Sequence, residues 1–136
     1  MAKFVATDFA ISINGTALSG NIAAATITTT AEEVETTAFG NTYRQRTAGL
    51  KDASVSLDWH QDYGAGSVHE ILNPLVGSLA TVTIVPTSAS VSATNPSVSA
   101  VFLVTEYSPV SGTIGDLSTF STTFPLGTGV VSYATA

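Results

Sequence analysis

The stretch DASVSLDWHQD, residues 52–62, alternates apolar and polar side chains more regularly than any other part of the chain. Val55, Leu57 and Trp59 fall on one side, and the polar residues between them fall on the other. A period of two residues is typical of a β-strand with one buried face. The stretch therefore predicts a strand whose apolar face is directed at a core.

The composition of the whole chain supports a β protein. At 136 residues it has the size of one domain, and we expect a single β domain over 1–136. Val, Ile and Thr together supply 42 residues, whereas Lys and Arg total only four. β-Branched residues favour strands, and four long basic side chains are too few to coat many amphipathic helices.

Charge and cysteine content exclude several classes of function. Ten acidic residues against four basic ones give a net charge of −6, so a nucleic-acid grip built from clustered Lys and Arg is excluded. The chain has no cysteine, which excludes disulfides and thiolate metal sites. No apolar run approaches the roughly 20 residues of a membrane helix, so no membrane partner is expected. With 44% hydrophobic and only 10% charged residues, we expect other subunits to cover part of the surface.

Turn residues divide the rest of the chain into further strands. Asn14-Gly15 is the strongest short hairpin signal, because both residues tolerate a positive φ. It separates a strand over 8–13 from a return strand that includes Leu18 and restarts over 22–30, with an irregularity at Gly20-Asn21. Further strands are expected over 79–86, over 98–107 as a central strand covered on both faces, over 117–126, and over 130–133 after a turn at Gly127 and Gly129.

A single short helix is expected after Gly66. Ser67 and Glu70 have the spacing of a capping box, in which the two side chains bond to the exposed N–H groups of the first turn. Val68, Ile71, Leu72, Leu75 and Val76 then follow with helical spacing, and Pro74 limits the helix to two or three turns. We expect Leu72 and Val76 to be buried. The fold class is therefore mainly β, a β-sandwich or partly open barrel of about seven strands with one short helix packed on it.

Residues 31–50 differ from the rest of the chain and predict a long loop or an extended hairpin. Acidic residues come first, basic residues come last, and no period is sustained. A loop of this length in a compact domain is usually functional or held by a partner. Such charges suit a surface complementary to a copy of itself, although they also fit a solvated loop or a cation site. The candidate inter-subunit residues are Glu32, Glu33, Glu35, Phe39, Gly40, Arg44, Arg46 and Lys51.

No set of residues predicts catalysis or a bound cofactor. Asp58, His60 and Asp62 fall on one side of a strand and are potential metal ligands, but such neighbours stand roughly 6–7 Å apart. The alternative is that they form the polar face of that strand, and we favour it. His69 and Ser67 do not have the arrangement of a base and a nucleophile. We therefore expect no catalytic, cofactor-binding or metal-binding residues, and no enzyme.

Three segments resemble the tail tube proteins of long-tailed bacteriophages with siphovirus-type tails. They are EVETTAFG (33–40) followed by Arg44 and Arg46, AGLKDASVSLDW (48–59), and GDLSTFSTTF (115–124), which is similar to the closing strand of that family. The layout matches over nearly the whole chain, from the N-terminal hairpin through the charged loop and the short helix to the β-rich second half. Each motif is short, and their order and spacing carry the resemblance.

The resemblance implies a structural virion protein. Members of this family form rings, expected here to be hexameric, which stack into a hollow tube through which double-stranded DNA passes without specific binding. It implies other copies of this chain and other tail proteins as partners, and synthesis in the bacterial cytoplasm before incorporation into the virion. The alternatives are another phage component, such as a tail terminator or capsid decoration protein, and a non-catalytic adhesion or binding module.

Overall fold

The computed structural model describes residues 5 and 7–135, which form seven antiparallel strands and one short helix. The strands are β1 (Ala10–Ile13), β2 (Thr16–Ala17), β3 (Ile22–Glu35), β4 (Arg46–His60), β5 (Leu79–Val85), β6 (Ser97–Leu103) and β7 (Thr119–Ala134). The helix is α1 (Val68–Leu72), and two 3₁₀ turns span Ser19–Asn21 and Asn73–Leu75. The strands follow the order β2-β1-β5-β6-β7-β4-β3 in one sheet, which confirms the mainly β prediction. Among the described residues, no helix is long and apolar enough to cross a membrane.

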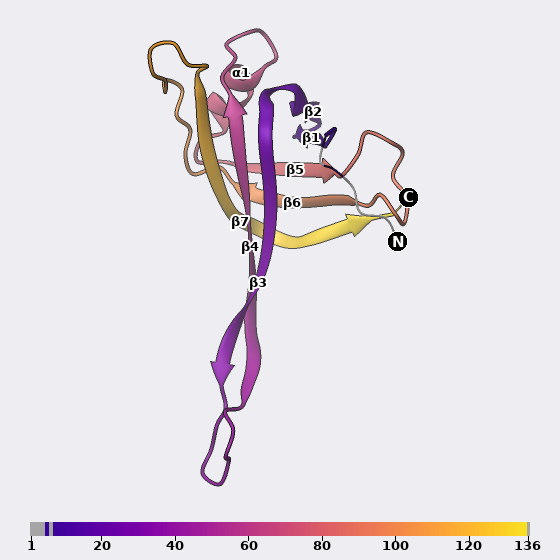
Figure 1. Ribbon diagram of the computed structural model, residues 1–136, viewed down its shortest axis with the longest axis vertical. Helices are drawn as coiled ribbons and strands as arrows, with labels where there is room; N and C mark the ends of the chain where they lie inside the picture. Colours follow the sequence, from indigo (N-terminus) through magenta and orange to yellow (C-terminus); the bar gives the residue numbers. More distant parts are fainter. Residues whose placement is uncertain (1–4, 6, 136) are drawn as a thin grey trace.

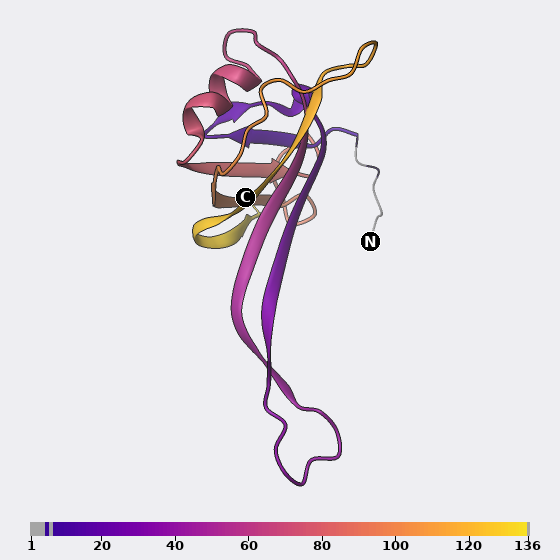
Figure 2. The same cartoon turned by 90° about the vertical axis from the view of Figure 1, so that its left-hand side faces the viewer.

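Strand β7 bends this sheet into its partly open shape. Its first part, residues 119–125, pairs with β4, and its second part, from Leu126 to Ala134, pairs with β6. The group β1, β5 and β6 therefore crosses the group β3 and β4 at a steep angle, with β7 running from one group to the other (Figures 1 and 2). The strands belong to one bent sheet and do not separate into the two sheets of a sandwich.

The predicted turn at Gly127 and Gly129 is wrong, because β7 continues through both residues. Two register shifts against β6 and the positive φ of Gly129, 72°, absorb the bend. Gly127 lies so close to the backbone of β6 that an added Cβ would stand 3.2 Å from the amide nitrogen of Leu103. The glycines therefore permit a corner within a strand, where the sequence alone suggested a chain reversal.

The core fills the inside of the bend. Val55, Leu57 and Trp59 of β4 are fully buried, as the alternation predicted. The Trp59 indole donates a hydrogen bond of 2.9 Å from Nε1 to Oγ1 of buried Thr122, which satisfies the polar atoms of both side chains. The Trp59 ring also stacks on Phe120, with centroids 6.0 Å apart. β4 and β7 are thus joined on their inner faces by apolar contact and by one buried hydrogen bond.

The N-terminal turn forms as predicted, but β2 ends at Ala17 instead of including Leu18, and β6 ends at Leu103 instead of continuing to Tyr107. Asn14 and Gly15 have φ of 50° and 84°, and the predicted irregularity at Gly20-Asn21 is a 3₁₀ turn. β6 lies between β5 and β7 in the sheet and is central. Its residues Ala100 and Phe102 are buried, but the opposite face is only half-buried, so a second cover is absent from the described part of the chain.

The helix packs as predicted at its start and differs at its end. Val68 and Leu72 are fully buried against the core. The helix ends at Leu72, and the 3₁₀ turn that contains Pro74 changes the spacing of the residues after it. Val76 has an extended ψ of 123° and is 47% exposed, so its predicted burial is wrong.

The predicted capping box does not form. The Ser67 hydroxyl makes no hydrogen bond to the helix; it donates to Oδ2 of Asp62 at 2.8 Å and accepts from Nδ2 of Asn21 at 2.8 Å. The Glu70 carboxylate accepts from the N–H of Gly66 at 3.1 Å. The hydroxyl of Ser67 therefore ties the start of the helix to the residues that follow β4 and precede β3, instead of capping the helix.

Candidate functional site

The most distinctive surface of the molecule is an arm formed by residues 28–52, all of which are exposed. β3 and β4 pair from Ile22 to Glu35 and continue as a two-stranded ribbon beyond the end of the body (Figures 1 and 2). The predicted long loop over 31–50 is therefore an extended hairpin, with strand pairing at both ends and a loop of residues 36–45. The first buried residue beyond the arm is Ala53, so the core does not support the ribbon.

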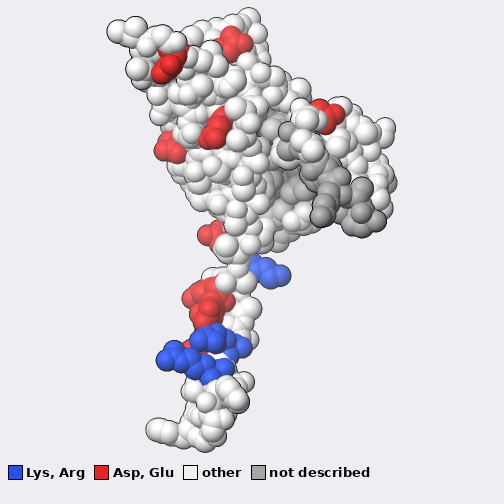
Figure 3. Space-filling model, in the orientation of Figure 1, with Lys and Arg blue, Asp and Glu red and all other residues white. Residues whose placement is uncertain are grey.

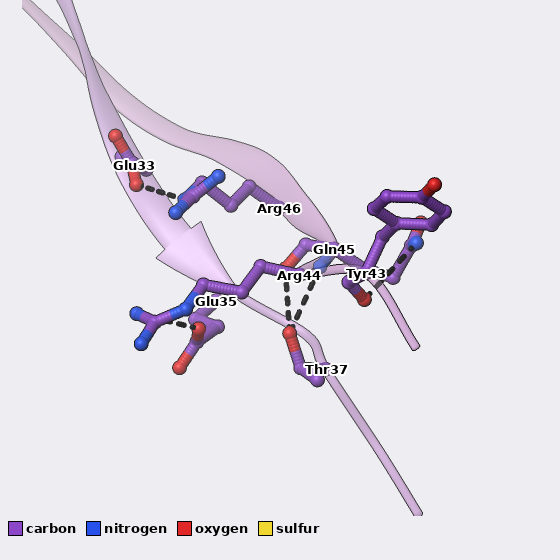
Figure 4. Close-up of polar contacts among 7 residues, drawn as sticks. All are labelled: Glu33, Glu35, Thr37, Tyr43, Arg44, Gln45 and Arg46. Atoms are coloured by element: carbon purple, nitrogen blue, oxygen red, sulfur yellow. Dashed lines mark hydrogen bonds and ion pairs between the residues drawn. The ribbon is translucent and has the colours of Figure 1, made fainter. Parts of the chain in front are cut away.

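The acidic and basic residues of the arm pair with each other inside one chain. Cross-strand register places Glu35 opposite Arg46, so the acids of β3 face the bases of the returning strand. Glu35 lies 3.6 Å from the Arg44 guanidinium, and Glu33 forms an ion pair with Arg46 (Figure 4). All four side chains are at least 45% exposed, and each pair contributes about 0–1 kcal/mol. The sequence suggested that these four charges pair with a second copy of the chain. Because they already pair within their own chain, they can do so only if these ion pairs first open.

The remaining candidate charges lie nearer the body. Lys51 is paired with Ala31 in the ladder, and Glu32 lies so near Gly49 that a Cβ added to this glycine would stand 3.2 Å from the Glu32 Cβ. Neither makes one of the ion pairs found among the described residues. Figure 3 shows the acidic and basic groups of the arm as adjacent bands, whereas the side of the body seen there carries only scattered acids among uncharged residues. The visible basic charge of the molecule is thus concentrated on the arm.

The loop at the end of the arm presents aromatic side chains to solvent. Phe39 is fully exposed and Tyr43 is 81% exposed. The loop is held in shape by its own polar groups: Oγ1 of Thr37 accepts from the Gln45 amide at 2.8 Å, and Oδ1 of Asn41 accepts from the Ala38 amide at 2.8 Å. Gly40, at φ 93°, closes the turn. Exposed aromatic rings that are held in place by an ordered backbone are more typical of an interaction surface than of a solvated loop.

A hollow of about 320 Å³ lies where the arm joins the body. β7 contributes its bent second half, and the arm contributes its base. Tyr133 and Val130 are exposed at 64% and 76%, so the hollow has an apolar rim. The lining residues are Thr29, Lys51, Asp52, Ala53, Leu126, Gly129, Val130, Val131 and Tyr133. This surface was not predicted from the sequence, because a turn expected at Gly129 would separate Tyr133 from the arm.

Two of the three residues considered as metal ligands, Asp58 and Asp62, make hydrogen bonds within the fold. Asp58 accepts from the hydroxyl of Ser121 at 2.7 Å, across the β4–β7 ladder. Asp62 accepts from the N–H of Gly64 and from the Ser67 hydroxyl, both at 2.8 Å, and these bonds lower the pKa of its carboxyl group. Within residues 5 and 7–135, no three His, Asp or Glu side chains are placed to hold one metal ion.

His69 belongs to an aromatic cluster that fastens the segment after β6. Its Nδ1 lies 2.7 Å from the hydroxyl of Tyr107, which also accepts from Nε2 of Gln61 at 3.0 Å. Burial is the largest influence on the Tyr107 hydroxyl and raises its pKa. The Tyr107 ring contacts Phe120 edge-on, with centroids 5.4 Å apart. This network joins the helix, β4 and β7, and its groups are bonded to one another rather than directed at an open site.

Comparison with known proteins identifies the fold. No family model matches the sequence, and no curated protein matches it. The chain is similar to a chain in the virion of a native gene transfer agent particle, with a TM-score of 0.73 and 16% identity over 93% of this chain and 95% of that chain. It is also similar to a chain in the tail of an empty gene transfer agent particle with C6 symmetry, with a TM-score of 0.65 and 17% identity over 84% of this chain and 82% of that chain. The shared fold spans nearly the whole chain and supports the resemblance drawn from the sequence.

Proposed function

We propose that the protein is a structural virion subunit that polymerises as stacked rings into the tail tube of a phage-like particle. The observation that carries the proposal is the arm, which is exposed throughout residues 28–52 and ends in exposed aromatic side chains. An isolated domain gains no stability from such a projection, whereas a polymerising subunit uses it to reach a neighbour. The fold shared with a chain of a C6-symmetric tail favours hexameric rings.

The arm is proposed to connect successive rings. Its strands extend by about 3.3 Å per residue. The paired part of β4 outside the core, from Arg46 to Asp52, therefore adds about 23 Å of ribbon beyond Ala53 before the loop begins. On this proposal, the loop contacts a subunit of the adjacent ring, and the hollow at the base of the arm is a candidate receptor for Phe39 or Tyr43. Repetition around the ring multiplies contacts that are individually weak.

The proposal is tested by assembly of the purified protein. We expect rings or tubes in negative-stain electron microscopy, and concentration-dependent association in analytical ultracentrifugation. Replacing both Phe39 and Tyr43 by Ser should leave the far-ultraviolet circular dichroism of the body unchanged and abolish tubes. The matched control is Val76→Ser, which removes an exposed apolar side chain from the body. A wild-type protein that stays monomeric up to millimolar concentration contradicts the proposal.

The ion pairs of the arm are proposed to keep the ribbon in its docking shape. Reversal of Arg44 and Arg46 to Glu replaces two attractive pairs by four carboxylates close together on the arm. We expect a folded body, because the arm is outside the core, and a loss of polymerisation. Normal tubes from this variant would show that the arm charges do not matter for the contact, and loss of folding would show that the arm supports the body.

The net charge of −6 supports the proposal that the tube does not bind the DNA that passes through it. Like charges on the subunit and on phosphate repel, so the polymer is proposed to let double-stranded DNA pass without specific contact. A gel-shift assay at low ionic strength, where any basic grip would be strongest, should show no retention of duplex DNA. Tight binding under these conditions would contradict this part of the proposal.

The scarcity of charge also fits a tail terminator or a decoration protein, and rings that never stack would favour the terminator.

A further inference from the structure

The two strands of the arm do not pair evenly along their length. Ala31 lies opposite Lys51, and the next pair in the ladder is Glu33 opposite Ala48. One residue of β3 but two residues of β4 therefore separate these neighbouring pairs. An extra residue on one strand of an antiparallel pair is a β-bulge. Residues 49–50 of β4 are called the arm bulge below.

The arm bulge consists of a crowded glycine and an exposed leucine. A Cβ added to Gly49 would stand 3.2 Å from the Cβ of Glu32 and 3.2 Å from Cγ2 of Val34. Side chains of β3 thus occupy the space that a side chain at this position would need, which is a common reason for a glycine within a strand. Leu50 is 81% exposed. The extra residue is therefore accommodated outside the core.

The arm bulge decides which charges of the arm meet. Cross-strand partners lie on the same face of a ribbon, so Arg46, opposite Glu35, shares the face of Glu35 and Glu33. Arg46 and Glu33 form one of the two ion pairs of the arm. An unbroken ladder continued from Ala31 and Lys51 would move Arg46 to the other face, away from both acids. One extra residue in β4 thus brings acids and bases onto one face.

The arm bulge also lies in the part of the ribbon that twists. A bulge bends its strand and increases the local right-handed twist. Near the end of β3 the two strands cross over one another in both views (Figures 1 and 2). The loop of residues 36–45 follows directly, so its direction depends on this twist. Residues 28–52 are all exposed, so packing against the core does not determine the direction instead.

We propose that the arm bulge orients the arm: it sets the direction in which the loop of residues 36–45 projects, and hence the place at which the loop meets a second copy of the chain. The proposal rests on the proposed function, since it specifies how the arm reaches a neighbour. An evenly paired ribbon would carry the same ion pairs and have nearly the same length, but its loop would point elsewhere. Direction, beyond reach and charge, is what the extra residue contributes.

Two changes of chain length remove the arm bulge by opposite routes. Deletion of Leu50 leaves a single residue of β4 opposite Glu32. Insertion of a serine after Glu32 gives each strand two residues between the flanking pairs, and it also turns the charged face to the other side of the arm. The deletion shortens one strand by about 3.3 Å and the insertion lengthens the other by as much. The control is Leu50→Ser, which removes the exposed side chain and keeps the bulge.

The direction of the arm is measured on dilute protein by pulsed electron paramagnetic resonance. The chain has no cysteine, so one spin label can be attached at Thr42→Cys in the loop and a second at Val76→Cys or Ser90→Cys on the body, all exposed positions. We expect both bulge-free variants to change these distances by more than the roughly 3.3 Å of one residue, and Leu50→Ser to leave them unchanged. Changes within that length in either variant would overturn the proposal.

Assembly tests whether the direction of the arm matters. We expect the critical concentration to rise about tenfold or more in both bulge-free variants, equivalent to about 1.4 kcal/mol, whereas Leu50→Ser assembles like the wild type. Circular dichroism establishes that the variants are folded. Normal assembly of either bulge-free variant, or an equal loss in Leu50→Ser, would contradict the orienting role and leave the ring-forming function in place. A wild-type protein that never assembles would overturn the proposed function, and with it the contact to a second copy, even if the loop moves in both variants.

Discussion

Replacement of Gly127 by Ala should destabilise the folded subunit through the corner of β7. A Cβ at this position would meet Leu79 Cδ2 at 2.3 Å, the Leu103 amide nitrogen at 3.2 Å and the Phe102 carbonyl carbon at 3.3 Å. Leu79 is 48% exposed and its side chain is free to turn aside. The two backbone atoms belong to a paired strand and move only if β6 shifts with them.

The cost of the change follows from which atoms must move. Forcing an extra methyl group against packed backbone costs about 1–3 kcal/mol. For a chain of this length that corresponds to a Tm lower by roughly 3–15 °C. The control is Gly20→Ala, because Gly20 has no positive φ and an added Cβ there meets nothing within 4 Å. We expect the control to change the free energy of unfolding by less than about 0.5 kcal/mol.

The protein carries its own probe for this measurement. Trp59 is the single tryptophan and is fully buried, so its fluorescence reports loss of the core on heating or in urea. The measurement is made on dilute protein, where subunit association does not add to stability. Equal midpoints for Gly127→Ala and Gly20→Ala would refute the argument, since they would mean that β7 and β6 part without cost at the corner.

Three further predictions concern the core, the helix and acid stability. Thr122→Val leaves the buried Trp59 N–H without an acceptor and should lower the free energy of unfolding by about 1–3 kcal/mol in urea titrations; an unchanged value would show that the indole finds another partner. Leu72→Ala should cost about 2–5 kcal/mol, whereas Val76→Ala should cost less than about 0.5 kcal/mol, and similar midpoints for the two would contradict the observed end of the helix. The lowered pKa of Asp62 means that the unfolded chain binds the proton more tightly, so its contribution to stability is complete above the ordinary carboxyl pKa and is lost as the pH falls through the folded value. Asp62→Asn should therefore flatten the acid limb of the stability profile, and an identical profile in wild type and variant would contradict the assignment.

The parts of the fold that the sequence predicted are those determined by neighbouring residues. The alternation in β4 needs only one buried side, and Val55 to Trp59 supply it. The Asn14-Gly15 turn needs two adjacent residues that accept a positive φ, and it forms as expected. The helix begins at the expected residue because apolar side chains at helical spacing find the core whether or not the cap forms.

The predictions that were wrong concern features that depend on residues distant in sequence. The spacing of Ser67 and Glu70 fits a capping box, but Asp62 and Asn21 take the Ser67 hydroxyl, and only the packed structure brings them there. Gly127 resembles a turn glycine, and the approach of β6 that requires it is a tertiary contact.

The charged hairpin was predicted in outline. The charged stretch, with Phe39 at its centre, was recognised from composition and length. Its internal pairing was not, because cross-strand register decides which acid meets which base, and a ladder across residues 31–50 was only one of two alternatives.

The exposure of the arm also makes its length independent of the body. Side chains beyond Thr30 fill no space in the core, so residues can be added or removed there without repacking it. Added in matched pairs, one on each strand, they keep the ladder closed, and two such pairs restore the same side chains to the same face. Each matched pair changes the reach by about 3.3 Å, and two by about 7 Å. The arm can therefore be treated as a spacer in which a small, even change in sequence length resets the distance at which one molecule meets the next.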